Sequence, residues 1–400
     1  MSPNIPNPKS KIQNPKVETQ IPADAALHSL NIGQGIVVVK VGSAMLADPK
    51  GNPDPTVLGR LAQLIAAWME RGRPVVLVSS GAIAAGRGTL NWSRRPRTLP
   101  EKQALAATGQ SHLMYAYVRA FGRYNRHVAQ ILLTREDMDH RRRYLNARYT
   151  IEKLIELGVV PIINENDTTA VEEIEFGDND ILAAMVAVKV QARLLLILTT
   201  TDGLMSGGPS RGRSAQLIPR VERVTSEIEA FVSEDMSSLG RGGMQSKLLA
   251  ARTVTRAGIP AILANGCSPE TFRLLESDQV RGTLFVAQKG RRFSRRDQWI
   301  LAARLGQTCR LVIDDGARRA LIEGKKSLLP AGVCQVIGSF DPGAVLEIVD
   351  QNGRVIACGL TNYGAEDIER IKGLRTGQIA GVLGRKPYDE VVHRDNLVIL

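Results

Sequence analysis

Cysteine is scarce in this sequence of 400 residues, which contains only Cys267, Cys309, Cys334 and Cys358. No two of them form a Cys-x-x-Cys pair, and each has apolar or glycine neighbours. The spacing therefore predicts buried, free thiols rather than zinc ligands or disulfides. Because free thiols persist in a reducing compartment, we expect a cytoplasmic protein.

Long hydrophobic runs are also missing. The longest, such as 194–198, have the length of a strand and fall far short of the ~20 residues of a membrane-spanning helix. The N-terminal stretch MSPNIPNPKSKIQNPKVETQIP has no apolar core and is rich in Pro, Asn and Lys. It predicts a disordered tail over residues 1–34 rather than a signal peptide, and we expect no membrane contact.

The sequence has fewer acidic than basic residues: it contains 40 Asp and Glu and 52 Lys and Arg, which gives a formal net charge of +12. A basic balance favours anionic partners such as phosphates, nucleotides, acidic metabolites or RNA, and it says nothing about the fold. With 44% hydrophobic residues, the chain is globular and long enough for more than one domain.

Short runs of Val, Ile and Leu alternate with helical stretches up to about residue 290. The predicted strands are 35–41, 74–79, 127–133, 159–163, 194–198 and 259–264. Helical spacing of apolar residues marks 57–71, 101–121 and 141–157. Near-continuous apolar strands separated by helices are typical of a parallel sheet that is covered on both faces. The predicted fold class is α/β, a three-layer αβα sandwich with a mainly parallel sheet over residues 35–290.

The character of the chain changes near residue 290. A basic, polar stretch predicts a linker over 291–305. Short strand-like runs then recur at 307–314, 333–337, 344–350, 355–359 and 397–400, and Asp350–Gly353 reads as a hairpin turn. We expect a second, mostly β domain of small-barrel type over 306–388, followed by a C-terminal segment, 389–400.

Two familiar phosphate-binding signatures are absent. There is no GxxxxGK[ST] and no GxGxxG, which argues against P-loop NTPases and ordinary dehydrogenases.

Parallel α/β sheets bind ligands beyond the carboxyl ends of their strands. There, Lys40 is followed by Gly42, a pairing suited to phosphate, although an exposed lysine on the sheet rim fits equally. Residues 79–86 are small and lie at the start of a predicted helix. They would allow a ligand to approach the N–H groups there, or allow the helix to pack tightly on the sheet.

Amides and acids gather in the stretch 163–180, INENDTTAVEEIEFGDND. Their spacing does not match an EF-hand, and a ligand that carries an ammonium group suits them better. Asp178 is also placed to cap the helix predicted over 181–190. Farther along, the glycine-rich stretch 239–247 opens another helix and brings a second lysine, Lys247, toward Lys40; alternatively, it is a surface loop.

Together these motifs resemble the amino-acid kinase family, in particular its members that phosphorylate glutamate. The resemblance covers about residues 35–287 and rests on the following stretches: VVKVGSAML, VLVSSGAIAAGR, KQALAATGQ, LLTREDM, YLNAR, PIINENDTTA, FGDNDILAA, LGRGGMQSK and GTLF. It implies ATP-dependent phosphorylation of the side-chain carboxylate of L-glutamate to L-glutamyl 5-phosphate, the first step of L-proline biosynthesis. It further implies inhibition by L-proline, a homo-oligomer (a tetramer in the family) and Mg²⁺ carried by ATP.

The resemblance also implies roles for single residues. Lys40 and Lys247 would contact the ATP phosphates and the transition state, and Asp180 would orient both lysines. Ser80, Asp167 and Asn179 match the family's glutamate-binding positions. The residues that match its ATP-binding positions are Lys40, Thr199, Thr200, Arg241, Gly242, Gly243, Met244, Gln245, Ser246 and Lys247. No protein ligand for a metal is implied. A substrate carboxylate is already ionised at pH 7, so the reaction needs positioning and charge neutralisation rather than a general base.

Two positions depart from the family pattern, and both lie on the nucleotide side. The family usually reads Leu-Thr-Asp where this chain has Leu-Thr-Thr at 198–200, with an acid only at Asp202, and Arg241 replaces a usual threonine. We expect these changes to affect ATP affinity or nucleotide preference.

The tail, about 308–384, resembles a PUA domain through VIDDGARRALIEGKKSLLPAGV and GAVLEIVDQNGRVIACGLTNY. Such domains bind RNA in RNA-modifying enzymes. Here the basic residues lack an aromatic stacking platform, which favours a solvated face over RNA binding. Two alternatives stay open: a kinase for N-acetylglutamate or aspartate, and an RNA-binding protein on a degenerate kinase scaffold.

Overall fold

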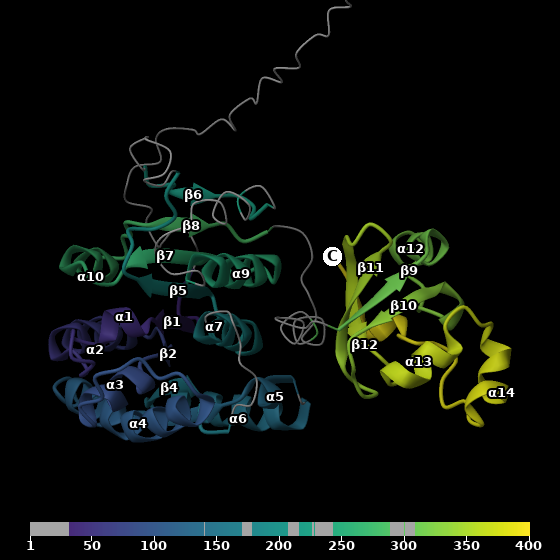
Figure 1. The fold of residues 1–400 in the computed structure, drawn as a ribbon. Coiled ribbons are helices and arrows are strands. Elements are labelled where there is room, and N and C mark those ends of the chain that lie inside the picture. The colour runs from purple at the N-terminus through teal and green to yellow at the C-terminus, as the bar shows by residue number, and fades with distance from the viewer. Residues whose placement is uncertain are drawn as a thin grey trace, which may run out of the picture.

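The computed structural model describes residues 32–139, 141–169, 178–206, 216–225, 228, 243–288, 300 and 309–400. Within these ranges the chain forms an N-terminal α/β domain and a C-terminal domain with its own sheet (Figure 1). Almost all of the predicted tail (1–34) and linker (291–305) lies outside the described residues. No helix in the described ranges is long and apolar enough to cross a membrane.

The first domain is built on an eight-stranded sheet in the order β3-β4-β2-β1-β5-β7-β8-β6. Its strands are β1 Val37–Val41, β2 Val75–Ser79, β3 Val128–Leu133, β4 Val160–Glu165, β5 Leu194–Thr199, β6 Arg220–Val221, β7 Ala261–Asn265 and β8 Thr283–Phe285. All neighbouring pairs are parallel except β7 with β8. The predicted parallel sheet is confirmed.

Two layers of helices cover this sheet (Figure 1). One face carries α1 Ser43–Leu46, α2 Pro55–Glu70, α3 Ala82–Thr89, α4 Leu99–Gly122 and α10 Pro269–Glu276. The other carries α5 Arg135–Asp139, α6 Arg141–Glu156, α7 Asp178–Lys189 and α9 Gly243–Arg256. Successive strand residues alternate between the two layers: Val37 and Val39 pack in one core, and Val38 packs in the other. Because both sides of the central strands are buried, β1, β2, β4 and β5 are apolar except near their carboxyl ends, and the αβα sandwich is confirmed.

Local signals place the helix starts. Asp54 accepts hydrogen bonds from the backbone N–H groups of Thr56 (2.7 Å) and Val57 (3.3 Å), which caps α2. A capping box between Thr98 and Glu101 opens α4. The helix α7 is described from Asp178 onward, and the residues that precede it lie outside the described ranges, so the capping role of Asp178 stays a prediction.

Helices α3 and α4 cross with their backbones in contact. A Cβ on Gly86 would lie 1.9 Å from the carbonyl oxygen of Leu105, and a Cβ on Gly109 would lie 1.9 Å from that of Ala82. Only glycine fits at either position. The turn that precedes α3 needs glycine as well, because Gly81 has φ +110°. These contacts fix the loop after β2 relative to α4.

The second domain is a five-stranded sheet in the order β10-β9-β11-β12-β13, with mostly antiparallel pairs. Its strands are β9 Arg310–Ile313, β10 Val333–Ile337, β11 Val345–Asp350, β12 Val355–Leu360 and β13 Leu397–Ile399, with helices α12 Asp315–Ile322, α13 Ala365–Ile371 and α14 Ile379–Leu383. Strands β11 and β12 form the predicted hairpin. The C-terminal segment contributes β13, which pairs with β12.

The prediction that the cysteines are buried is wrong for two of them. Cys267 and Cys334 are exposed, Cys309 is half-buried, and Cys358 is buried. Cys334 lies on β10, a strand at the edge of the second sheet in which three of the five residues are exposed. Cys267 lies two residues after the end of β7, where the chain turns at the sheet edge.

Candidate active site

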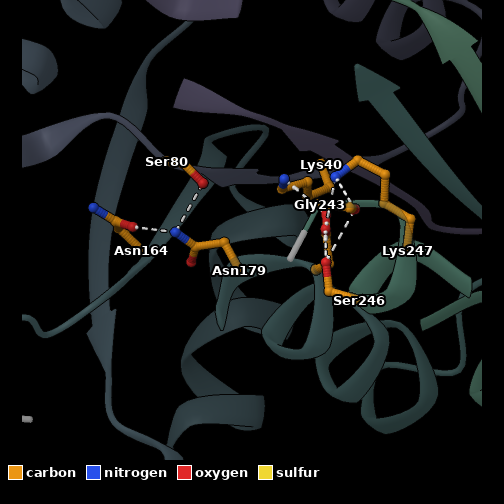
Figure 2. Close-up of polar contacts among 8 residues, drawn as sticks. Lys40, Ser80, Asn164, Asn179, Gly243, Ser246 and Lys247 are labelled. Carbon is orange, nitrogen blue, oxygen red and sulfur yellow. Dashed lines mark hydrogen bonds and ion pairs between the residues drawn. The ribbon is translucent and has the colours of Figure 1, made fainter. Parts of the chain in front are cut away.

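The candidate residues meet at the carboxyl edge of the first sheet, around its centre (Figure 2). Strand β1 lies between β2 and β5, so the chain connections leave the sheet in opposite directions on its two sides. This is the position at which open parallel sheets bind ligands. Figure 2 shows two neighbouring groups: Ser80, Asn164 and Asn179 form one, and Lys40, Gly243, Ser246 and Lys247 form the other.

Asp180 joins the two predicted catalytic lysines. Its Oδ1 lies 2.7 Å from Lys40 Nζ, and its Oδ2 lies 3.0 Å from Lys247 Nζ. The side chains are only 7%, 13% and 2% exposed for Lys40, Lys247 and Asp180. Asp180 and Lys247 follow Lys40 by 140 and 207 residues in the sequence. The fold thus brings together side chains that are far apart along the chain.

The charges of this cluster are coupled. Burial lowers the pKa of the Lys40 ammonium, and the charge of Lys247 adds to the effect, while Asp180 opposes it. Burial also disfavours the charged form of Asp180, yet the attraction of both lysines holds the pKa of its carboxyl below the ordinary value. Asp180 is therefore ionised at neutral pH and orients two cations toward the sheet edge.

Ser246 and the first turn of α9 complete the cluster. The buried Ser246 hydroxyl donates to Asp180 Oδ2 at 2.7 Å, and Lys247 Nζ donates to the carbonyl oxygen of Gly243 at 2.7 Å. The serine side chain is thus directed at the carboxylate between the lysines. Its predicted role in nucleotide binding stays a prediction.

The second group is a chain of amides. Asn179 Nδ2 donates to Ser80 Oγ (2.9 Å) and to Asn164 Oδ1 (3.0 Å). Asn164 Nδ2 in turn donates to Oε1 of Gln110, which lies on α4, at 2.8 Å. Two of the predicted glutamate-binding residues, Ser80 and Asn179, are therefore in direct contact.

Asp167, the third predicted glutamate-binding residue, lies two residues after the end of β4, the strand that carries Asn164. Burial raises the pKa of its carboxyl to about 6. A carboxylate that is partly stripped of water binds an ammonium ion more strongly than an exposed one, because less water screens the pair.

The predicted nucleotide side is only partly described. Thr199 ends β5, and Thr200 follows it. Asp202, the displaced acid, accepts a hydrogen bond of 2.8 Å from Asn265 Nδ2 at the end of β7. Gly243, Met244 and Gln245 open α9. Arg241 and Gly242 lie outside the described residues, so the expected effect of the Arg241 departure stays a prediction.

Sequence reasoning did not assign a role to Asn164 or Gln110. Asn164 had a usable signal, because it is the first polar residue after the apolar run of β4. Gln110 lies 54 residues away on the helix α4; it ends the stretch KQALAATGQ of the family resemblance, but nothing in the sequence pairs it with Asn164. The sequence also assigned no role to Tyr117, whose buried hydroxyl lies 2.8 Å from Ser79 Oγ.

Comparison with known proteins agrees with this geometry. Residues 35–265 match the amino acid kinase family, and residues 309–383 match the PUA domain. The chain belongs to the amino acid kinase family and is a phosphotransferase. Its similarity is to glutamate 5-kinases: those of Citrifermentans bemidjiense and Moorella thermoacetica are each 46% identical over 364 residues, which is 91% of this chain and 97% and 96% of theirs. The resemblance recognised in the motifs is confirmed.

Among solved structures, a carbamate kinase from Giardia lamblia bound to AMP-PNP aligns with a TM-score of 0.45 and 17% identity, over 64% of this chain and 99% of that one.

Proposed function

We propose that this chain transfers the γ-phosphoryl group of ATP to the side-chain carboxylate of L-glutamate, which yields L-glutamyl 5-phosphate and ADP in the first step of L-proline biosynthesis. The observation that carries the proposal is the juxtaposition at one sheet edge of two lysines bridged by Asp180 and an amide cluster suited to an amino acid. The similarity to glutamate 5-kinases over most of the chain supports the choice of substrate.

The reaction needs no proton transfer. A carboxylate oxygen of glutamate attacks the γ-phosphorus, the bond from that phosphorus to the β–γ bridging oxygen breaks, and ADP leaves with the electron pair. The obstacle is the approach of two anions. Lys40 and Lys247 offset that charge, and Asp180 keeps both ammonium groups in place when ATP is absent. Mg²⁺ enters with ATP and is held mainly through phosphate oxygens.

Three further properties belong to the proposal. L-Proline competes at the amino-acid site, since it shares the ammonium and α-carboxylate of glutamate and lacks the reacting carboxylate. The enzyme assembles as a homo-oligomer, a tetramer by analogy with the family, and light scattering tests this. It works in the cytoplasm, where its thiols stay reduced.

The test is ADP release by the purified protein with Mg-ATP and L-glutamate, N-acetyl-L-glutamate or L-aspartate, each with and without L-proline. We expect turnover on L-glutamate alone and suppression by proline. Turnover on N-acetyl-L-glutamate would instead favour the nearest alternative, because an acylated amine has no use for the charge of Asp167. Release that proline leaves unchanged would remove only the inhibition from the proposal.

RNA binding by the PUA domain stays a prediction with little support. Arg318 of α12 is paired with Asp315 at 3.2 Å, which leaves less charge for an RNA backbone. A gel shift at low salt, with the full chain, tests it: binding that weakens steeply with salt would support an RNA role.

A further inference from the structure

The backbone determines which atom of each amide in the site is the oxygen. Oxygen and nitrogen of an asparagine side chain are distinguished by their hydrogen-bond partners. The backbone N–H of Glu165, which can only donate, lies 2.9 Å from one side-chain atom of Asn164. That atom must therefore be the acceptor, Oδ1, and the opposite atom is the donor, Nδ2.

This orientation passes to the neighbouring side chains. Since Asn164 presents Nδ2 to Gln110, the glutamine must present its oxygen, and their separation is 2.8 Å. Since Asn164 presents Oδ1 to Asn179, that residue must present its nitrogen, at 3.0 Å. The second hydrogen of the same nitrogen goes to Ser80 Oγ at 2.9 Å. Both hydrogens of Asn179 Nδ2 are thus used.

Two groups are left to face a ligand. Asn179 Oδ1 is buried and has no hydrogen-bond partner within the described part of the chain. A buried acceptor without a partner costs free energy, and a ligand that donates a hydrogen bond removes this cost. The Ser80 oxygen accepts from Asn179, so its own proton is available to a ligand oxygen. The site therefore offers one acceptor and one donor, side by side.

We propose that Gln110 is a positioning residue of the amino-acid site, which holds Asn164, and through it Asn179, so that Asn179 Oδ1 accepts a hydrogen bond from the ammonium group of the substrate. Asp167 supplies the charge for that ammonium group, and the Ser80 hydroxyl donates to a substrate carboxylate. This inference rests on the proposed function. Gln110 itself acts through Asn164 and touches no reacting atom.

The close crossing of α3 and α4 explains how a residue of α4 reaches the site. Gly109, next to Gln110, lies against the backbone of α3 with no space for a side chain. The helix that carries Gln110 is therefore held at a fixed distance from the loop that carries Ser80. A glutamine at this place can meet Asn164 without moving either helix.

The experiment compares Gln110→Met, which keeps the length of the side chain and removes the acceptor, with Gln110→Glu, which keeps an acceptor for Asn164 Nδ2. For each protein we would measure kcat and KM with L-glutamate, and the inhibition constant of glutarate, which lacks the ammonium group. We expect Gln110→Met to raise the KM for L-glutamate roughly tenfold, as for a lost buried hydrogen bond. Its kcat and its glutarate inhibition should change less than about threefold, and Gln110→Glu should restore most of the affinity.

The outcomes separate the two proposals. Equal weakening of glutamate and glutarate by Gln110→Met would indicate general loosening and overturn the positioning role, as would an unchanged KM. If Gln110→Met does not fold in a thermal melt, Gln110→Ala, which adds no bulk, is measured by the same criteria. If the wild-type protein turns over L-glutamate and Gln110→Met and Gln110→Glu have the same KM for it, this inference alone is refuted. A wild-type protein without turnover on L-glutamate would refute the proposed function, and this inference with it.

Discussion

Replacing Asp167 with asparagine keeps the shape of the side chain and removes its charge. Burial raises the pKa of the Asp167 carboxyl from 3.8 to about 6. If its ionised form binds the substrate ammonium, the competent fraction is about 97% at pH 7.5 and about 9% at pH 5, so kcat/KM for L-glutamate should fall about tenfold over this range. Asp167→Asn should lose about 1.5–3 kcal/mol of substrate binding at pH 7.5, a rise in KM of roughly 10- to 150-fold.

The same substitution should stabilise the free protein. Because the pKa in the folded state lies above the ordinary value, the folded state binds a proton more tightly between about pH 4 and 6. The charged carboxylate therefore lowers the free energy of unfolding above pH 6, and this effect disappears as the pH falls below 4. Asp167→Asn should raise the free energy of unfolding at pH 8 by about 1–3 kcal/mol, and by little at pH 4.

The assay is a pH series of initial rates for wild type and Asp167→Asn, together with denaturant unfolding at pH 4 and pH 8. Titration of ATP and of the substrate carboxylate affects wild type and variant equally, so it cancels in the ratio of their kcat/KM values. A ratio of the two kcat/KM values that stays constant from pH 7.5 to pH 5 would refute the assignment of Asp167 to the ammonium group.

Three other substitutions test the rest of the site. Lys247→Ala should lower kcat about 100-fold or more and change the glutamate KM only a few-fold, because its charge acts on the transition state; steady-state kinetics check this, and an unchanged kcat contradicts it. Asp180→Asn leaves the buried Lys40 and the half-buried Lys247 without their carboxylate, so the free energy of unfolding should fall by about 3–5 kcal/mol. ATP should restore part of it, and a melting temperature that ATP raises no more than in wild type would contradict this. Gly109→Ala places a Cβ 1.9 Å from the carbonyl oxygen of Ala82, so the free energy of unfolding measured in urea should fall by about 3 kcal/mol. An unchanged free energy of unfolding would contradict the close helix crossing.

The central strands could be predicted because they are buried on both faces. Every residue of β1 and β2 is buried, so their sequences are apolar runs in which only Lys40 and Ser79, near the carboxyl ends, are polar. The strands β6 and β8 were not predicted. They contain two and three residues, too few for any periodic signal, and they form only by pairing at the edge of an existing sheet.

The charged half of the site was predictable from order along the chain. A lysine at the end of β1 and one at the start of α9 meet because parallel strands end at the same edge of a sheet. The direction of the hydrogen bonds was not predictable. Gln110 reaches Asn164 only through the crossing of α3 and α4, and the vacant acceptor of Asn179 depends on the backbone N–H of Glu165. Neither contact leaves a pattern in the sequence.

The most direct test of the proposed reaction identifies the bond that is made. The protein is incubated with Mg-ATP, L-glutamate and hydroxylamine, which converts an acyl phosphate to a stable hydroxamate, and mass spectrometry quantifies the hydroxamate against ADP. We predict one γ-glutamyl hydroxamate for each ADP, and loss of both products in Lys247→Ala. Release of ADP without hydroxamate would show that the side-chain carboxylate is not the acceptor and would contradict the proposal.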